Sequence, residues 1–185
     1  DATVTIGDGA TTAAVSVRGI VTDQIVEENE TVIITLASLT GDAQTTINDG
    51  AKVATVTITD DDVATVSITA NDAAATEAAV DVGKFIVTQS KASSTATVIT
   101  YNITGTATNT TDYATLSGTV TIAAGATEAT IDVSGIIDDA IVEANETVIV
   151  TITNVAGDPQ TTLDDSVGAN VATVTITDDD AATVS

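Results

Sequence analysis

Alternation of apolar and polar residues runs along most of this chain, and Thr fills many of the polar positions. Val120 and Ile122 alternate with threonines, and Val148, Val150 and Ile152 alternate with Thr147, Thr151 and Thr153, with Ile at position 149. The same period recurs in residues 65–69, 84–89, 97–104, 129–135 and 172–177. Successive side chains of a strand point to opposite faces, so this period predicts half-buried β-strands. Seven or so short strands separated by Gly, Asn and Asp turns predict an all-β fold, an antiparallel immunoglobulin-like β-sandwich. No run shows a convincing 3.6-residue period, though residues 143–149 could begin with a helical turn.

Internal similarity organises the chain into tandem repeats. Three stretches occur twice in the same order: ATVTITDDD at 54–62 and 172–180, NETVI at 29–33 and 145–149, and GDAQTT at 41–46 with GDPQTT at 157–162. The period is the size of a whole domain and far exceeds the roughly 20–50 residues of solenoid repeats. We therefore expect residues 63–180 to form one complete repeat. Residues 1–62 then form the C-terminal half of another sandwich, and residues 181–185 begin the next.

The partial repeat carries a hazard of its own. Half a sandwich exposes an apolar sheet face and unpaired strand edges, which favour association with other chains. We therefore expect residues 1–62 to be completed by a part absent from this chain, either a neighbouring copy or a preceding segment.

Composition excludes several classes of function. Asp and Glu number 27 against four Lys and Arg, so the formal net charge is −23. Such a surface repels phosphate backbones and anionic lipids, and no apolar run approaches the roughly 20 residues of a membrane-spanning helix. Neither nucleic-acid binding nor direct membrane insertion is expected. Without His or Cys the chain has no imidazole base and no thiol nucleophile, so we expect no enzyme activity.

Acidic residues of the complete repeat gather at two main places. Residues 136–146 (IIDDAIVEANE) contain four of them, and residues 178–180 are three consecutive Asp. Crowded carboxylates repel one another unless they are solvated or bridged by a cation. Hard cations such as Ca²⁺ take about six to eight oxygen ligands, which clustered Asp and Glu supply. The alternative is that these residues are solvated corners that keep an acidic array soluble.

The motif IIDDAIVEANETV (136–148), with TDY (111–113) upstream and ITDDD (176–180) at the end, resembles the Calx-beta domain. That family occurs in sodium–calcium exchangers, integrin subunits and many large bacterial surface proteins, and the resemblance covers residues 63–180. In calcium-binding members the ions cluster at one end of the sandwich, beside the junction with the following domain. Carried over by motif, the implied Ca²⁺ ligands are Glu77, Asp112, Asp138, Asp139, Glu143, Glu146, Asp178, Asp179 and Asp180. In the partial repeat, where Thr22 replaces the first Asp of the IIDD pair, a weaker site is implied at Asp23, Glu27, Glu30, Asp60, Asp61 and Asp62.

The function expected from these features is structural. We expect a calcium-binding repeat of a large extracellular stalk, adhesin or filament protein, in which Ca²⁺ rigidifies the repeat junctions. Its partners are neighbouring repeats, and its location is the cell surface or the secreted fraction. Two alternatives stay open: a ligand-binding adhesion module, and a calcium-sensing regulatory domain of a membrane protein. The scarcity of aromatic residues and Arg counts against the adhesion module.

Overall fold

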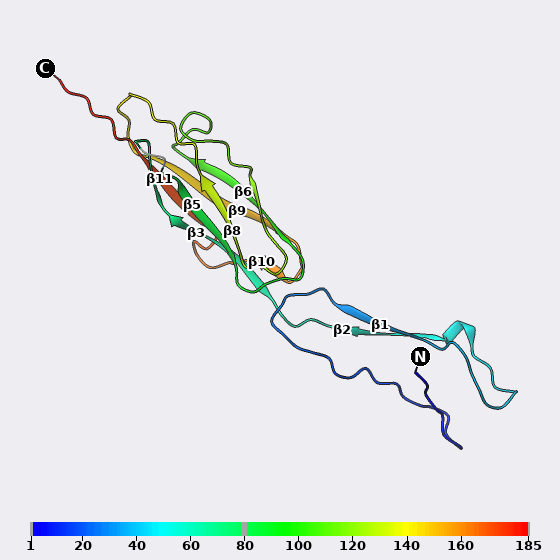
Figure 1. The fold of residues 1–185 in the computed structure, drawn as a ribbon. Helices are drawn as coiled ribbons and strands as arrows, with labels where there is room; N and C mark the ends of the chain where they lie inside the picture. The colour runs from blue at the N-terminus through cyan, green and yellow to red at the C-terminus, as the bar shows by residue number, and fades with distance from the viewer. Residues whose placement is uncertain (1, 79–80, 185) are drawn as a thin grey trace. The chain divides into compact units, whose positions relative to one another are not determined.

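The computed structural model describes residues 2–78 and 81–184, which form two compact units. Unit 1 comprises residues 1–23 and 29–60, and unit 2 comprises residues 24–28 and 61–185. The elements are β1 (Glu30–Thr35), the 3₁₀ turn η1 (Asp49–Ala51), β2 (Val53–Ile58), β3 (Ala64–Asp72), β4 (Ala74–Thr76), β5 (Gly83–Gln89), β6 (Thr97–Gly105), β7 (Thr119–Ile122), β8 (Glu128–Val133), β9 (Glu146–Ala156), β10 (Thr161–Leu163) and β11 (Val171–Thr177) (Figure 1). Within the described ranges, no helix has the length and apolar content needed to cross a bilayer.

Unit 2 is a β-sandwich, as the alternating sequence predicts. One sheet has the strand order β10-β3-β5-β8, and the other has the order β4-β11-β9-β6-β7 (Figure 1). The inward positions of both sheets form a single core, which includes Phe85 and Val87 from β5, Val148 and Val150 from β9, and Val174 from β11. Val, Ile and Thr make up most of the residues in these strands, because β-branched side chains pack well on a pleated surface. The predicted all-β sandwich is confirmed.

Two short strands and one turn differ from the sequence-based expectation. β4 and β10 were not predicted, and each pairs in parallel, β4 with β11 and β10 with β3. A strand of three residues is too short to show an alternating period, so only tertiary pairing defines it. The helical turn considered for residues 143–149 is wrong. Glu146 begins β9 instead and lies opposite Ile176 of β11, so sheet pairing decides the conformation there.

Unit 1 contains one two-stranded sheet, formed by β1 and β2. Val32 lies opposite Val56, the same register that places Val148 opposite Val174 in β9 and β11. The two sequence repeats therefore pair their equivalent strands in the same register.

The apolar residues of unit 1 are more exposed than their counterparts in unit 2. Ile6 is 57% exposed whereas Ile122 is 1% exposed, and Leu36 is 47% exposed whereas Ile152 is 2% exposed. In unit 2 these positions are covered by strands that precede β7, for which residues 1–62 have no equivalent. Completion of residues 1–62 by another segment or copy stays a prediction, as do the domain boundaries 1–62, 63–180 and 181–185.

One glycine fixes the packing of β6 against β9. Gly105 lies opposite Val148 at the end of β6, with a φ of +126°. A Cβ added there would lie 2.0 Å from the carbonyl oxygen of Thr147, which is backbone and cannot move aside locally. Gly105 thus holds β6 close to the residue that follows Glu146.

We predict that Gly105→Ala destabilises unit 2 by about 2 kcal/mol or more, because strain at positive φ adds to a backbone collision. The matched control is Gly168→Ala, where φ is +83° but no heavy atom lies within 4 Å of the added Cβ. The control should cost only about 1 kcal/mol, the cost of the backbone conformation. Urea unfolding measures both variants, and equal losses would show that the close approach to Thr147 is unimportant.

Candidate metal centre

Sheet pairing brings the first and last predicted ligands together at one end of the sandwich. β4 and β11 run in parallel, and Thr76 lies beside Thr177 where both strands end. Glu77 and Asp178 therefore leave the sheet as neighbours, and the backbone N–H of Glu77 donates to the carbonyl oxygen of Thr177 at 3.2 Å. Glu77 is buried, at 8% exposure, which is unusual for a carboxylate, and within the described residues no ion pair of Glu77 is seen.

The loop between β6 and β7 presents Asp112 to the same end. Its neighbour Tyr113 is buried in the core and anchors the loop, while Asp112 stays partly exposed. The backbone N–H of Thr108 donates to Oδ2 of Asp112, which orients the carboxylate. The N–H of Ile137 donates to the Asp112 carbonyl oxygen at 3.1 Å. That contact brings the loop between β8 and β9, with the IIDD pair, against the TDY turn.

The β8–β9 loop is also tied to the residues that follow β11. The backbone N–H of Glu143 donates to Oδ2 of Asp178 at 2.9 Å, a bond across 35 positions of sequence. The other Asp178 oxygen, Oδ1, accepts the N–H of Asp180 at 3.2 Å. Within the loop, Oδ1 of Asp139 accepts the N–H of Ile141 at 2.7 Å. Carboxylates thus cap the backbone of this loop and bring its acidic residues close to one another.

Three raised pKa values show how closely the acidic groups are placed. Burial raises the pKa of Glu77, and the charges of Asp178, Glu143, Asp139 and Asp179 raise it further. The pKa of Glu146 rises from 4.5 to about 7, first through burial and then through a hydrogen bond with Asp112 and the charges of Asp112, Glu143 and Glu77.

The third raised pKa belongs to Asp180. Burial is its largest cause, followed by the charges of Asp178, Asp179, Asp138 and Asp139. These three sets of interactions include all nine predicted residues of the complete repeat. The structure therefore brings all nine into one electrostatic cluster, although sequence separates the first from the last by about a hundred positions.

The acidic cluster has the donor chemistry that Ca²⁺ requires. Every side-chain donor is a carboxylate oxygen, the hard ligand type that Ca²⁺ prefers. Two of these oxygens, Oε2 of Glu146 and Oδ2 of Asp180, are buried without a hydrogen-bond partner. Buried polar atoms in that state are uncommon and call for a missing partner. The residues fit the ion, while their role as ligands stays a prediction.

The cluster is open rather than tightly converged. Across residues 2–78 and 81–184, Asp60, Asp61 and Asp62 are the one group of three acidic residues whose ligand atoms all lie within 4.8 Å of one another. Among the described residues, no three of the nine carboxylates of the complete repeat have ligand atoms that all lie this close together. Several of them must move closer to share one ion.

The partial-repeat residues have different surroundings. Asp62 is buried and forms an ion pair with Lys91, so one carboxylate of its triad already faces a cation. The N–H of Asp60 donates to Oδ1 of Asn29 at 3.1 Å. Asp23 and Glu30 are exposed and Glu27 is half-buried. Sequence reasoning missed Lys91, because its charge is visible but no pattern places it beside the Asp60–Asp62 triad.

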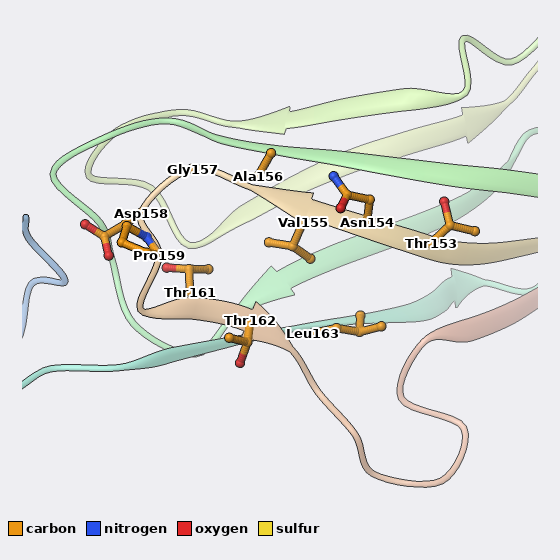
Figure 2. A pocket seen from close by; sticks show the side chains of 10 residues that line it. All are labelled: Thr153, Asn154, Val155, Ala156, Gly157, Asp158, Pro159, Thr161, Thr162 and Leu163. Atoms are coloured by element: carbon orange, nitrogen blue, oxygen red, sulfur yellow. The ribbon is translucent and has the colours of Figure 1, made fainter.

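A surface hollow of about 530 Å³ lies at the turn between β9 and β10 (Figure 2). Its lining runs from Thr153 to Leu163 and includes Asn154, Val155 and Asp158. The turn belongs to the end of the sandwich where β3 begins, since the N–H of Ala64 donates to the carbonyl oxygen of Gln160. The hollow is thus remote from the acidic cluster and carries a single charged residue.

The family model of the Calx-beta domain matches residues 1–62 and 60–180. The chain belongs to the Calx-beta family. Calx-beta domains bind calcium, so Ca²⁺ is confirmed as the cofactor expected of a chain of this family. A search of curated proteins returned no match.

Three solved structures resemble the Calx-beta chain. The crystal structure of CBD12 from CALX1.2 has 22% sequence identity and a TM-score of 0.50, covering 62% of this chain and 45% of that one. The apo-form Calx CBD1 domain has 24% identity and a TM-score of 0.49, covering 63% and 99% of the two chains. The calcium binding domain CBD12 of CALX1.1 has 23% identity and a TM-score of 0.48, covering 61% and 44%. This chain therefore spans less than half of either CBD12 chain, and the first likeness supports the sandwich fold alone.

We predict that metal-free unit 2 becomes less stable as the pH rises from about 4.5 to about 7. Because the pKa of Glu146 is about 7 in the folded chain and near 4.5 when unfolded, the folded state holds the extra proton in this window. Raising the pH removes that proton and its stabilisation. The raised pKa values of Glu77 and Asp180 act in the same direction.

Urea unfolding in chelator at pH 5 and pH 7.5 measures the effect. Glu146→Gln should remove a large share of the pH dependence, whereas Glu128→Gln, at an exposed position of β8, should keep it. A full pH dependence in Glu146→Gln would show that this carboxyl group is not its source.

Proposed function

We propose that this chain is a calcium-binding structural repeat of an extracellular stalk, adhesin or filament, in which Ca²⁺ stiffens the repeat junctions. One observation carries the proposal: nine carboxylates from separate segments of the repeat gather at one end of a sandwich, where burial and neighbouring charge raise the pKa values of Glu77, Glu146 and Asp180. Such a cluster is unfavourable by itself and becomes favourable when a divalent cation neutralises it. Membership of a calcium-binding family supports the same conclusion.

The ligand set follows from the contacts within the cluster. Glu77 is the central candidate, since four of the other carboxylates raise its pKa. The backbone N–H of Glu143 ties the β8–β9 loop to the carboxylate of Asp178, and Asp112 is near enough to Glu146 to raise its pKa. Asp138, Asp139, Asp179 and Asp180 lie around them. Bound Ca²⁺ supplies positive charge that allows these groups to be ionised together.

The position of the cluster supports a role at junctions. Asp178, Asp179 and Asp180 immediately follow β11, and residues 181–185 begin the next repeat of the sequence pattern. An ion held by carboxylates that follow β11 and by the β8–β9 loop restrains the backbone where one repeat passes into the next. A chain of such repeats is stiffened at each junction, which suits a stalk or filament outside the cell.

A regulatory role would use the same ion site with a different consequence. A calcium sensor passes the change at the site to another part of its protein, whereas a stalk element uses the ion to limit bending. The near-identity of the two ATVTITDDD segments favours a repeated structural unit. The two roles are separated by how the shape of the chain responds to Ca²⁺.

We predict that Ca²⁺ stabilises unit 2 and that the effect depends on the cluster. A ligand at 100 times its dissociation constant adds about 2.7 kcal/mol per site to the free energy of unfolding. Glu146→Gln combined with Asp178→Asn should lower Ca²⁺ affinity at least tenfold. The matched control, Asp164→Asn combined with Asp165→Asn in the loop before β11, removes two carboxylates outside the cluster. It should leave the Ca²⁺ affinity unchanged. Titration calorimetry and thermal melts measure both, and equal melting temperatures in Ca²⁺ and in chelator would contradict calcium binding.

We predict that Ca²⁺ also narrows the range of shapes sampled by the whole chain. Small-angle scattering of the full chain should show a narrower distribution of interatomic distances in Ca²⁺ than in chelator. Asp60→Asn combined with Asp61→Asn should reduce the difference if the Asp60–Asp62 triad contributes. If calorimetry detects binding while the scattering curves coincide, Ca²⁺ does not stiffen the chain and the regulatory role is favoured.

A further inference from the structure

A five-residue segment that carries the acidic-loop motif packs as part of the unit 2 sandwich. Residues 24–28 belong to unit 2, and Val26 within them is completely buried, at 0% exposure. Val26 forms a parallel β-bridge with Ser93, in the turn between β5 and β6. The N–H of Val26 donates to the Ala92 carbonyl oxygen at 2.9 Å, and the Val26 carbonyl oxygen accepts from the N–H of Ser94 at 2.9 Å. The backbone N–H and carbonyl oxygen of Val26 are thus both hydrogen-bonded to the β5–β6 turn.

Further polar contacts surround this buried valine. The hydroxyl of Ser93 also donates to the Val26 carbonyl oxygen at 3.1 Å, and Ser93 is itself buried. Nε2 of Gln160, in the β9–β10 turn, donates to the Glu27 carbonyl oxygen at 3.2 Å. Close by in sequence, Lys91 forms its ion pair with Asp62. The β5–β6 turn therefore forms a docking surface, called the receiver below, with two contact points. Residues 92–94 bind the backbone of a valine, and Lys91 binds the carboxylate of an aspartate.

The complete repeat carries a second copy of both docked groups. IVEENE at residues 25–30 recurs as IVEANE at 141–146, so Val142 corresponds to Val26. The two TDDD segments align letter for letter, so Asp180 corresponds to Asp62. Val142 is 52% exposed where Val26 is 0% exposed. Oδ2 of Asp180 is buried without a hydrogen-bond partner where Asp62 has Lys91.

We propose that Val142 and Asp180 dock onto the β5–β6 turn of another copy of this repeat. Val142 takes the place of Val26 against Ser93, and Asp180 takes the place of Asp62 on Lys91. The donor groups lie at the end of the sandwich where β4 and β11 finish. The receiver lies at the other end, where β5 passes into β6 and β3 begins. The contact is therefore head-to-tail, and it adds copies in one direction without closing.

The contacts of this latch are all between protein groups. Its contacts are backbone hydrogen bonds, a buried valine and a lysine–aspartate pair, and each is present at Val26 and Asp62. The latch also changes the role expected of Asp180, which the sequence analysis predicts as a Ca²⁺ ligand. In the latch its carboxylate pairs with Lys91 of the next copy, and Asp178 and Asp179 remain the candidate Ca²⁺ ligands beside the β8–β9 loop. Chelator therefore removes calcium binding and leaves the latch, so the two proposals fail separately.

Disulfide trapping tests the latch, because the chain contains no Cys. The chain is extended by joining a second copy of residues 63–180 after Asp180, and all measurements are made in chelator. Val142→Cys in the first copy is combined with Ser93→Cys in the second. The reference is Val26→Cys with Ser93→Cys in the original chain, where the β-bridge sets a separation that suits a disulfide. The matched control replaces Val142→Cys by Ile141→Cys, its exposed neighbour.

We expect the Val142 variant to cross-link at a rate within about threefold of the reference, and the Ile141 variant at least about tenfold more slowly, since adjacent side chains of an extended segment point to opposite sides. Lys91→Glu in the second copy should slow the Val142 reaction, and Lys91→Arg should preserve it. Equal rates for Val142 and Ile141 would indicate random collision and overturn the latch. So would absence of the Val142 cross-link, or failure of the Val26 reference itself.

Discussion

Mutual repulsion among carboxylates is the constraint on which the functional end of this protein depends. The strands fix where each loop begins, and the loops then hold nine acidic groups near one another at one end of the sandwich. Burial and neighbouring charge raise the pKa of Glu146 to about 7 and also raise the pKa values of Glu77 and Asp180. A site of this kind is held together by the apolar core beneath it, because the ionised groups themselves oppose its assembly. The cation that such a site attracts turns this opposition into stabilisation.

The apolar core that holds the acidic groups in place is built from very few residue types. Among the described residues, the buried apolar side chains other than Phe85, Tyr101 and Tyr113 are Val, Ile and Ala, and most of them come from the two sheets of unit 2. The two tyrosines do more than fill space. Tyr113 anchors the turn that presents Asp112, and the OH of Tyr101 lies 3.4 Å from the hydroxyl of Ser117, in the segment that leads into β7. The packing of these two tyrosines in the core therefore helps to fix the β6–β7 loop, and with it the position of the Asp112 carboxylate.

The sequence predicted the sandwich and the two main acidic loops from local signals, whereas Glu77 and Asp112 were expected in the cluster only through the resemblance to the Calx-beta domain. A period of two marks strands longer than about four residues, and the IIDD and DDD motifs mark the acidic loops. β4 and β10 escaped prediction because three residues carry no period, and the start of β9 at Glu146 depends on pairing with β11. The burial of Val26 and the ion pair of Lys91 could not be predicted either. Both depend on which surface a short segment meets, and nothing local in IVEENE distinguishes a docked copy from an exposed one.

The direction of the strands has a mechanical consequence. β3 begins at one end of unit 2 and β11 finishes at the other, so tension applied at Val63 and Asp180 acts along the strand axes. The hydrogen bonds of an antiparallel ladder lie across that axis and carry such a load together, in shear, instead of opening one after another. The short parallel strands β10 and β4 add a second set of bonds to these two strands. The repeat is thus built to resist pulling along the array far better than peeling from its side.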